Sequence, residues 1–297
     1  MPCRTIAVAN QKGGTGKTAT TLSLGVALAR LGKRVLLVDA DPQGDLTKSL
    51  GWGDPDALEV TLANHLSAVI EGEGIESREG ILSHKEGIDL MPANIELAGM
   101  EMPILMAMSR EQLMNVWLAP LKADYDFILI DCAPTLGIIP VNAFVAADGV
   151  LVPVSAEYLP ASAMTALLKT VGRVRRQINP SLSVEGILIT LSDSRNNLAR
   201  EVEQTIREQY GASYRVFDTV IPRAVSAAEA PAVGASIFSY DGRGKAARAF
   251  ERLAEEEVGR GYEEGSHNVA RRGRAVHVPG GARRLGARGR GRHPAFA

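Results

Sequence analysis

The chain has few cysteines and histidines and no long uninterrupted apolar run. Its two cysteines, Cys3 and Cys132, lie far apart in the 297 residues, so they predict neither a disulfide framework nor a zinc site. The five histidines form no cluster with ligand spacing. The most apolar stretch, residues 138–154, is interrupted by two prolines, an asparagine and an aspartate, which argues against a membrane span. We therefore expect a protein of a reducing, cytoplasmic compartment.

Acidic residues are missing from one end of the chain. From Arg271 onward there are eight arginines and no acid, whereas residues 1–260 carry 25 basic and 32 acidic residues. Apolar periodicity stops at about Gly259, where glycine and arginine become frequent. Because such a composition buries little apolar surface, it favours disorder. We predict one folded domain over residues 1–260 and a disordered, Arg/Gly-rich tail over residues 261–297.

Short apolar runs alternate with segments of helix length in the folded domain. Val-, Ile- and Leu-rich runs predict buried strands at residues 5–9, 34–39, 126–131, 149–154 and 185–190. Residues 17–32 are typical of a helix that ends at Gly32. We interpret residues 51–87 as helices and loops peripheral to the sheet. The pattern predicts an α/β fold, with a parallel sheet flanked by helices on both faces and ligands at the carboxyl ends of its strands.

A glycine-rich loop follows the first predicted strand and reads KGGTGKT, from Lys12 to Thr18. Its glycines allow the backbone to curl so that several N–H groups face phosphate oxygens, and the following helix N-terminus adds partial positive charge. In this context Lys17 is expected to reach the β- and γ-phosphates, and Thr18 to bind Mg²⁺. The loop departs from the common spelling G-x-x-x-x-G-K-[ST], because Gln11 replaces the first glycine and Lys12 follows it.

Three aspartates end predicted strands on the same edge of the sheet. Asp39 and Asp41 close the run VLLVDAD, and Asp131 closes FILID. An aspartate after a buried strand in a phosphate-binding fold is the usual arrangement for holding Mg²⁺, often through a water. Asp39 and Asp131 are therefore candidate metal residues, although Asp39 could instead orient its neighbours.

The stretches NQKGGTGKT, LLVDADPQG, ILIDCAP, VIPR and EAPAVGASIFSYD together resemble the ParA/Soj family of chromosome- and plasmid-partitioning ATPases. This family belongs to the deviant Walker A group of P-loop NTPases, which includes MinD, and the resemblance covers residues 4–258. It implies ATP and Mg²⁺ as cofactors. It also implies an ATP-sandwich homodimer that binds DNA without sequence preference, associates with the nucleoid, and hydrolyses ATP weakly unless a ParB/Spo0J-like partner stimulates it. The cargo, chromosome or plasmid, stays open.

The resemblance also implies roles for single residues. Lys12 would touch the ATP phosphates of the partner subunit, and Asp41 would orient the attacking water. Thr18 and Asp131 match the family's Mg²⁺ residues, and Pro222 matches the loop that packs on adenine. The implied catalytic residues are Lys12, Lys17 and Asp41, and the implied nucleotide-binding residues are Lys12, Gly13, Gly14, Thr15, Gly16, Lys17, Thr18, Ala19 and Pro222.

The chain departs from the family pattern at several positions. Ala19 stands where relatives usually carry threonine, Ala133 replaces a usual proline, and Asp45 stands where asparagine is more frequent.

The resemblance also implies residues for DNA contact. Arg195 falls on a position that contacts DNA in the family, with Arg223, Arg243 and Lys245 as neighbours. Ser226 replaces an arginine that is frequent in Soj-like proteins, so the Arg/Gly tail is a second candidate for DNA contact.

Three other classes of protein are alternatives to this interpretation. A MinD-like membrane-cycling ATPase requires a C-terminal amphipathic helix, whereas the apolar residues after Gly261 are scattered among glycines and prolines. A redox iron protein requires cysteines that bridge an iron–sulfur cluster at a dimer interface, and neither Cys3 nor Cys132 suits that position. A metabolic ligase of the same fold requires its own substrate pocket, for which the sequence shows no motif.

Overall fold

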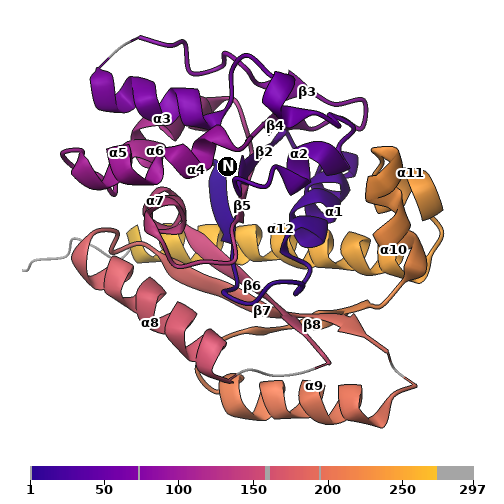
Figure 1. Ribbon diagram of the computed structural model, residues 1–297. Helices are drawn as coiled ribbons and strands as arrows, with labels where there is room; N and C mark the ends of the chain where they lie inside the picture. The colour runs from indigo at the N-terminus through magenta and orange to yellow at the C-terminus, as the bar shows by residue number, and fades with distance from the viewer. Residues whose placement is uncertain (1, 73, 158–160, 194, 273–297) are drawn as a thin grey trace, which may run out of the picture. The chain divides into compact units, whose positions relative to one another are not determined.

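An eight-stranded sheet forms the centre of the molecule in the computed structural model, which describes residues 2–72, 74–157, 161–193 and 195–272 (Figure 1). The strand order is β3-β4-β2-β5-β1-β6-β7-β8, and all neighbouring strands are parallel except β3 and β4. The strands are β1 (Arg4–Val8), β2 (Val35–Ala40), β3 (Leu82–Ser83), β4 (Asp89–Met91), β5 (Phe127–Cys132), β6 (Gly149–Ser155), β7 (Ser183–Ser192) and β8 (Val216–Pro222).

The five predicted strands are confirmed as β1, β2, β5, β6 and β7. Every residue of β2, β5 and β6 is buried, as expected for strands covered on both faces. Strands β4 and β8 were not predicted, and residues 51–87 contain the edge strand β3 in addition to the expected helices and loops. Because β3 has two residues and β4 three, neither carries a periodic signal. In β8 buried and more exposed residues alternate, so no continuous apolar run marks it.

Helices cover both faces of the sheet. One face carries α7 (Ile138–Ala146), α8 (Ala161–Gln177) and α9 (Asn197–Tyr210), which follow successive strands. The other carries α1 (Lys17–Arg30), as predicted, with Gly32 at φ 78° just beyond its end. Arg30 of α1 forms a 3.6 Å ion pair with Glu251, so the first part of the last helix, α12 (Lys245–Arg272), lies on that face too. The predicted two-sided α/β architecture is therefore confirmed.

Short helices and turns of 3₁₀-helix fill the connections. Those between β2 and β5 are α2 (Asp45–Ser49), η1 (Pro55–Ala57), α3 (Leu62–Glu71), α4 (Glu96–Gly99), α5 (Glu101–Met106), α6 (Leu113–Leu118) and η2 (Pro120–Ala123). Those between β8 and α12 are α10 (Val225–Glu229), η3 (Ala230–Val233) and α11 (Ile237–Asp241).

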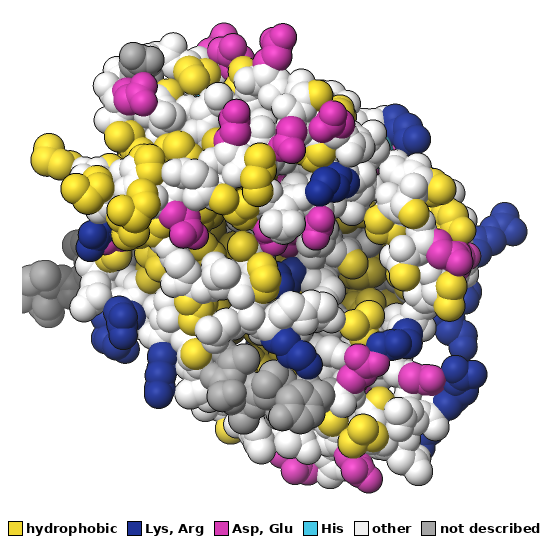
Figure 2. Space-filling view, viewed as in Figure 1, with side chains coloured by type: hydrophobic (Ala, Val, Ile, Leu, Met, Phe, Trp, Pro, Cys, Tyr) yellow, Lys and Arg dark blue, Asp and Glu magenta, His cyan; other side chains and the backbone are white. Residues whose placement is uncertain are grey.

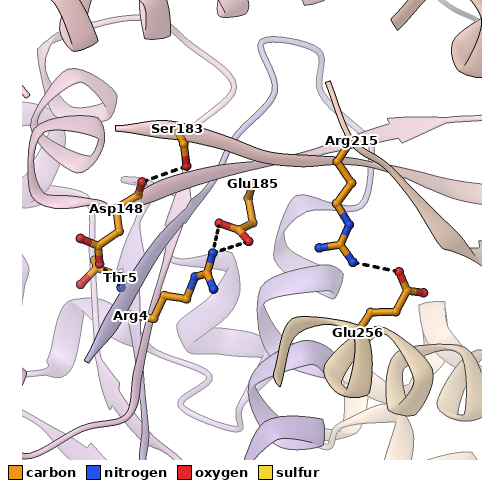
Figure 3. A network of polar contacts seen from close by, with 7 residues as sticks. All are labelled: Arg4, Thr5, Asp148, Ser183, Glu185, Arg215 and Glu256. Carbon is orange, nitrogen blue, oxygen red and sulfur yellow. Dashed lines mark hydrogen bonds and ion pairs between the residues drawn. The ribbon is translucent and has the colours of Figure 1, made fainter. Parts of the chain in front are cut away.

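Polar contacts tie together the sheet edge opposite the carboxyl ends (Figure 3). Arg4 at the start of β1 donates to both carboxylate oxygens of Glu185 in β7, at 2.8 and 2.9 Å. Asp148, before β6, accepts the Thr5 N–H at 2.8 Å. Glu185 is buried and depends on its partners, since removing one partner of a buried ion pair is strongly destabilising. These contacts stabilise the end of the sheet at which the strands begin. Ligands are expected at the opposite end, where the carboxyl ends of the strands lie.

The last helix extends beyond the expected end of the folded domain. The compact unit that contains the sheet ends at Glu256, and α12 continues to Arg272, inside the segment expected to be disordered. No proline interrupts residues 245–272, and the glycines at 259, 261 and 265, which disfavour a helix, are tolerated within it. Residues 273–297, which hold most of the arginine-rich tail, lie outside the described residues, and the domain boundary at residue 260 stays a prediction.

Candidate nucleotide site

The loop from Lys12 to Thr18 connects the carboxyl end of β1 to the first residue of α1, as its sequence predicted. Gly14 and Gly16 adopt φ values of 69° and 82°, a left-handed conformation that favours glycine. A side chain at Gly13 or Gly14 would meet no other atom within 4 Å, so the backbone there borders open space. The start of α1 has no side-chain cap, which leaves its first N–H groups for a ligand. This geometry suits an anion such as a phosphate.

Two neighbouring strands hold the loop in place. Asn10 donates from Nδ2 to the carbonyl of Pro153 in β6 at 2.7 Å, and its Oδ1 accepts the Lys12 N–H at 3.0 Å. Thr190 in β7 donates from Oγ1 to the carbonyl of Thr15 at 2.8 Å. Sequence reasoning missed Asn10 and Thr190. Asn10 could have been identified from the sequence, because it is a polar residue directly after a buried strand.

The two lysines of the loop have different surroundings. Lys17 is buried, and its Nζ donates to the Lys12 carbonyl at 3.4 Å. Burial lowers the pKa of Lys17, while Asp131 and Asp41 act in the opposite direction. A buried cation of this kind is ready to receive an anionic group that enters the loop. Lys12, in the same loop, is partly exposed.

Asp131 lies at the end of β5, directly beside the loop. It is buried and accepts a hydrogen bond from Thr21 Oγ1 at 3.3 Å, and a hydrogen bond from Thr18 is among the influences on its pKa. Burial raises that pKa to about 8, with a further contribution from Asp39. A divalent cation would offset the cost of a buried carboxylate. Asp131 and Thr18 therefore fit Mg²⁺, which commonly takes one or two protein oxygens together with substrate phosphates.

Asp39 and Asp41 form a second acidic pair at the end of β2. Asp39 is buried, and its Oδ2 accepts hydrogen bonds from the backbone N–H and the hydroxyl of Thr47, at 2.9 and 2.7 Å. Its Oδ1 accepts the Asp41 N–H at 3.2 Å. Both carboxylate oxygens are thus engaged within the protein, although burial raises the pKa to about 7. The arrangement favours an orienting role for Asp39 over a metal-binding one.

Asp41 is held by its neighbours and is less buried than Asp39. Its Oδ1 accepts the Gln43 N–H at 3.0 Å, which closes a tight turn after the strand. Asp45, for which sequence reasoning found no role, begins α2 directly after Gly44, where an acidic side chain favours the helix N-terminus. The turn holds the Asp41 carboxyl group at the strand-end edge that carries the loop.

The basic residues predicted to contact DNA lie beyond the ends of β7 and β8. The side chain of Arg195 is 88% exposed and forms a 3.0 Å ion pair with Asp193, whose pKa it lowers. Arg223 pairs with Glu157 and also contributes to the lowered pKa of Asp193, which places the two arginines near one another. Arg243 and Lys245 are exposed at the start of α12. Arg195 and Arg223 therefore carry acidic neighbours that a competing anion has to displace.

A basic cleft that sequence reasoning missed adjoins these residues. Its volume is about 500 Å³, and its walls come from the ends of β7 and β8, from α9 and from α12. Lys245, Arg248 and Arg252 recur at helical spacing along one side of α12, and that spacing was the available signal. Figure 2 shows Lys and Arg side chains gathered along the edge of the molecule near α9 and α10. The lining residues are Ser192, Arg200, Glu203, Val220, Pro222, Lys245, Arg248 and Arg252.

The cysteines differ from exposed cysteines that bind an iron–sulfur cluster at a dimer interface. Cys132 is buried, and burial raises the pKa of its thiol; the same effect raises the pKa of Cys3 to about 11. Over the described residues, His, Cys, Asp and Glu side chains form no group of three that could hold a metal ion. None of the helices described is both long and apolar enough to cross a membrane.

Comparison with known proteins identifies the family. Residues 3–184 match the family model described as an AAA domain. The chain is 38% identical to the chromosome partitioning protein ParA of Caulobacter vibrioides over 261 residues, which cover 87% of this chain and 95% of the relative. It is 40% identical to the sporulation initiation inhibitor protein Soj of Bacillus subtilis over 256 residues, which cover 86% of this chain and 98% of that protein.

Solved structures share the fold. A Mycobacterium smegmatis structure described as cobyrinic acid a,c-diamide synthase with bound ADP and magnesium has a TM-score of 0.76 and 38% identity, covering 89% of this chain and 96% of that one. The cell division ATPase MinD of Pyrococcus furiosus has a TM-score of 0.66 and 28% identity, covering 86% and 98%. On the sequence relatives and on the geometry of its phosphate-type loop, the chain belongs to the ParA/Soj family of partitioning ATPases.

Proposed function

We propose that this protein is a Mg²⁺-dependent ATPase whose ATP-bound homodimer binds DNA without sequence preference and drives segregation of a chromosome or plasmid with a ParB/Spo0J-like partner. The observation that carries the proposal is the pair of lysines in one loop, with Lys17 buried and Lys12 partly exposed. One cation suffices to bind a nucleotide in the chain's own loop. The second lysine, Lys12, would act on a nucleotide that is bound to the partner subunit and faces the loop.

ATP binding follows from the loop and the start of α1. The backbone N–H groups from Gly13 to Ala19 would surround the phosphates, and Lys17 would exchange its contact with the Lys12 carbonyl for a phosphate oxygen. Thr18 and Asp131 would hold Mg²⁺, which would neutralise charge on the phosphates. Ala19 contributes only its backbone here. Pro222, which lines the basic cleft at the end of β8, would pack on the adenine ring.

Hydrolysis would depend on Asp41. Its carboxyl group is positioned by the turn to Gln43 and by the contact of its N–H with Asp39. An acidic group at this place can orient a water molecule for attack on the terminal phosphate, as water-positioning residues do in other phosphoryl-transfer enzymes. A single orienting group with no strong base is consistent with slow turnover that a partner accelerates.

DNA binding would use the basic surface beyond β7 and β8. Arg195, Arg223, Arg243 and Lys245 need only reach phosphates, because contacts to the backbone require charge and placement but no readout of bases. Arg200, Arg248 and Arg252 extend this surface into the cleft. Dimerisation would bring two such surfaces together, which explains how ATP can control DNA affinity.

A ligase activity is the second candidate, because the M. smegmatis structure of 38% identity carries the name of an amide-forming synthase. Such an enzyme would consume ATP only when its acid substrate is present. Measuring ATP hydrolysis in the presence of ammonia or glutamine as nitrogen donor, with and without cobyrinic acid, separates the two functions: the partitioning function predicts no stimulation by the acid and stimulation by DNA with a ParB-like partner.

The proposal is tested by the mass of the protein in solution. Light scattering after gel filtration should give a monomer with ADP and Mg²⁺, and a dimer when the slowly hydrolysing Asp41→Ala variant is given ATP and Mg²⁺. A monomer under both conditions, at nucleotide concentrations that saturate binding, would contradict the ATP-sandwich mechanism.

A further inference from the structure

A methionine-rich apolar surface lies on α5 and the loops on either side of it. Met102, Leu105 and Met106 recur at helical spacing on α5, and 65% and 81% of Met102 and Met106 are exposed. Met108, in the next loop, is 90% exposed. Figure 2 shows hydrophobic side chains gathered over the part of the surface where Figure 1 has α5. We call the exposed set Ile95, Met102, Leu105, Met106, Met108 and Val116 the α5 patch.

Contacts with the core and with α7 anchor the segment that carries the α5 patch. Ile104 points into the core and is completely buried, which fixes the outward side of α5. Asn142 of α7 donates from Nδ2 to the Arg110 carbonyl at 2.8 Å and accepts the Met114 N–H at 3.2 Å. Ser109 adopts a left-handed φ of 52° within the loop that these contacts anchor. A preorganised surface loses little entropy when a partner binds to it.

Acidic residues border the α5 patch. Glu96 and Glu101 are exposed next to its apolar side chains, and Glu111 lies in the loop after Met108. Arg110 is the one basic residue of segment 95–116, and it is bonded to Glu111 at 3.1 Å and to the Leu105 carbonyl at 3.4 Å. Contiguous exposed apolar surface marks interaction sites, and methionine is frequent where a binding surface adapts to its partner. The acidic residues beside the α5 patch favour a partner of positive charge.

We propose that the α5 patch binds an amphipathic helix with a basic polar face, supplied by another protein. The apolar face of that helix would cover the methionines, and its lysines or arginines would face Glu96 and Glu101. A second copy of this chain fits less well, because self-pairing would bring like charges together. Nucleic acid and anionic lipid surfaces are disfavoured by the same glutamates.

The α5 patch lies beside the segment that follows Asp131. A side chain at Gly137 would lie 3.4 Å from the Glu101 carboxylate, and Gly137 ends the loop that begins after the strand of Asp131. A partner on α5 therefore borders the segment between Asp131 and α7. The binding proposal goes beyond the proposed function and does not require it, because the experiment is performed without nucleotide.

The experiment uses a fluorescent peptide of leucine and lysine, about five helical turns long and with leucine at helical spacing, titrated against the full chain and followed by anisotropy. Binding should weaken at least tenfold in the Met102→Gln/Met106→Gln variant and weaken with added salt. The control Val225→Gln/Val233→Gln changes two similarly exposed apolar residues elsewhere and should bind as the parent does. Because all four positions are exposed, the variants should keep the parental unfolding temperature.

Three results would overturn the proposal. Equal binding of the same peptide with glutamate in place of lysine would remove the role of the acidic border. Unchanged binding in the double methionine variant would place the peptide elsewhere. If the parent protein dimerises without nucleotide or sediments with anionic vesicles, and the methionine variant does neither, the occupant is a second copy or a membrane.

Discussion

Lys17 Nζ lies 3.4 Å from the carbonyl oxygen of Lys12, so the buried lysine of the loop contacts the backbone of the outer one. The contact closes a small cradle between Lys12 and the start of α1. Lys17 faces the inside of that cradle, near Asp131, whose charge counteracts the effect of burial on the lysine's pKa. The two lysines of the loop therefore differ in burial, and substitutions can separate their roles.

Lys17→Ala should abolish ATP binding, because the phosphates would lose the principal cation of a buried cradle. Isothermal titration with ATP and Mg²⁺ measures this directly. Lys33→Ala, which removes a lysine beyond the far end of α1, is the matched control and should bind as the parent does. Micromolar affinity in Lys17→Ala would sink the phosphate-loop interpretation.

Asp41→Ala should bind ATP normally and lose hydrolysis, since the attacking water is no longer oriented. We expect at least a hundredfold lower turnover together with accumulation of the dimer on DNA. Single-turnover release of phosphate gives the rate. Parental turnover in this variant would show that another group positions the water.

DNA affinity should depend on the folded basic surface more than on the tail. Arg195→Glu should remove most ATP-dependent binding, because charge reversal turns phosphate attraction into repulsion. Arg248→Glu tests the cleft in the same way. Deleting residues 261–297 should cost affinity only modestly and reduce the slope of log affinity against log salt, by about 0.9 for each DNA phosphate that the tail neutralises. ATP-independent binding that disappears with the tail would refute this assignment.

Stability should fall as the pH drops below about 6.5, in part because of His65. The ring is buried against Trp117 and lies 2.8 Å from the Glu79 carbonyl, and burial lowers the pKa of His65. Below the ordinary pKa of histidine, the unfolded chain binds a proton at His65 and the folded chain does not. A lower pH therefore favours the unfolded state. Urea unfolding on either side of that pH, about one unit above and one below, should show a smaller loss in His65→Gln than in the parent.

The parts of the structure that the sequence predicted are those with strong local signals. Continuous apolar runs identified the central strands, and the order of strand, glycine loop and helix placed Lys17 and Thr18. Asp39 shows the limit, because its role depends on Thr47, eight residues away, whose hydroxyl and N–H occupy one carboxylate oxygen. The basic cleft could not be predicted either, since Arg200 and Arg248 meet only when α9 and α12 approach the end of β8.

The proposed action of Lys12 on a second nucleotide is tested most directly by placing Lys12→Ala in the Asp41→Ala background. With ATP and Mg²⁺, this protein should still bind ATP within a fewfold of the parent affinity, yet stay monomeric and bind DNA no better than with ADP. Light scattering and fluorescence anisotropy on the same sample measure both properties. An ATP-dependent dimer that binds DNA normally without Lys12 would contradict the account.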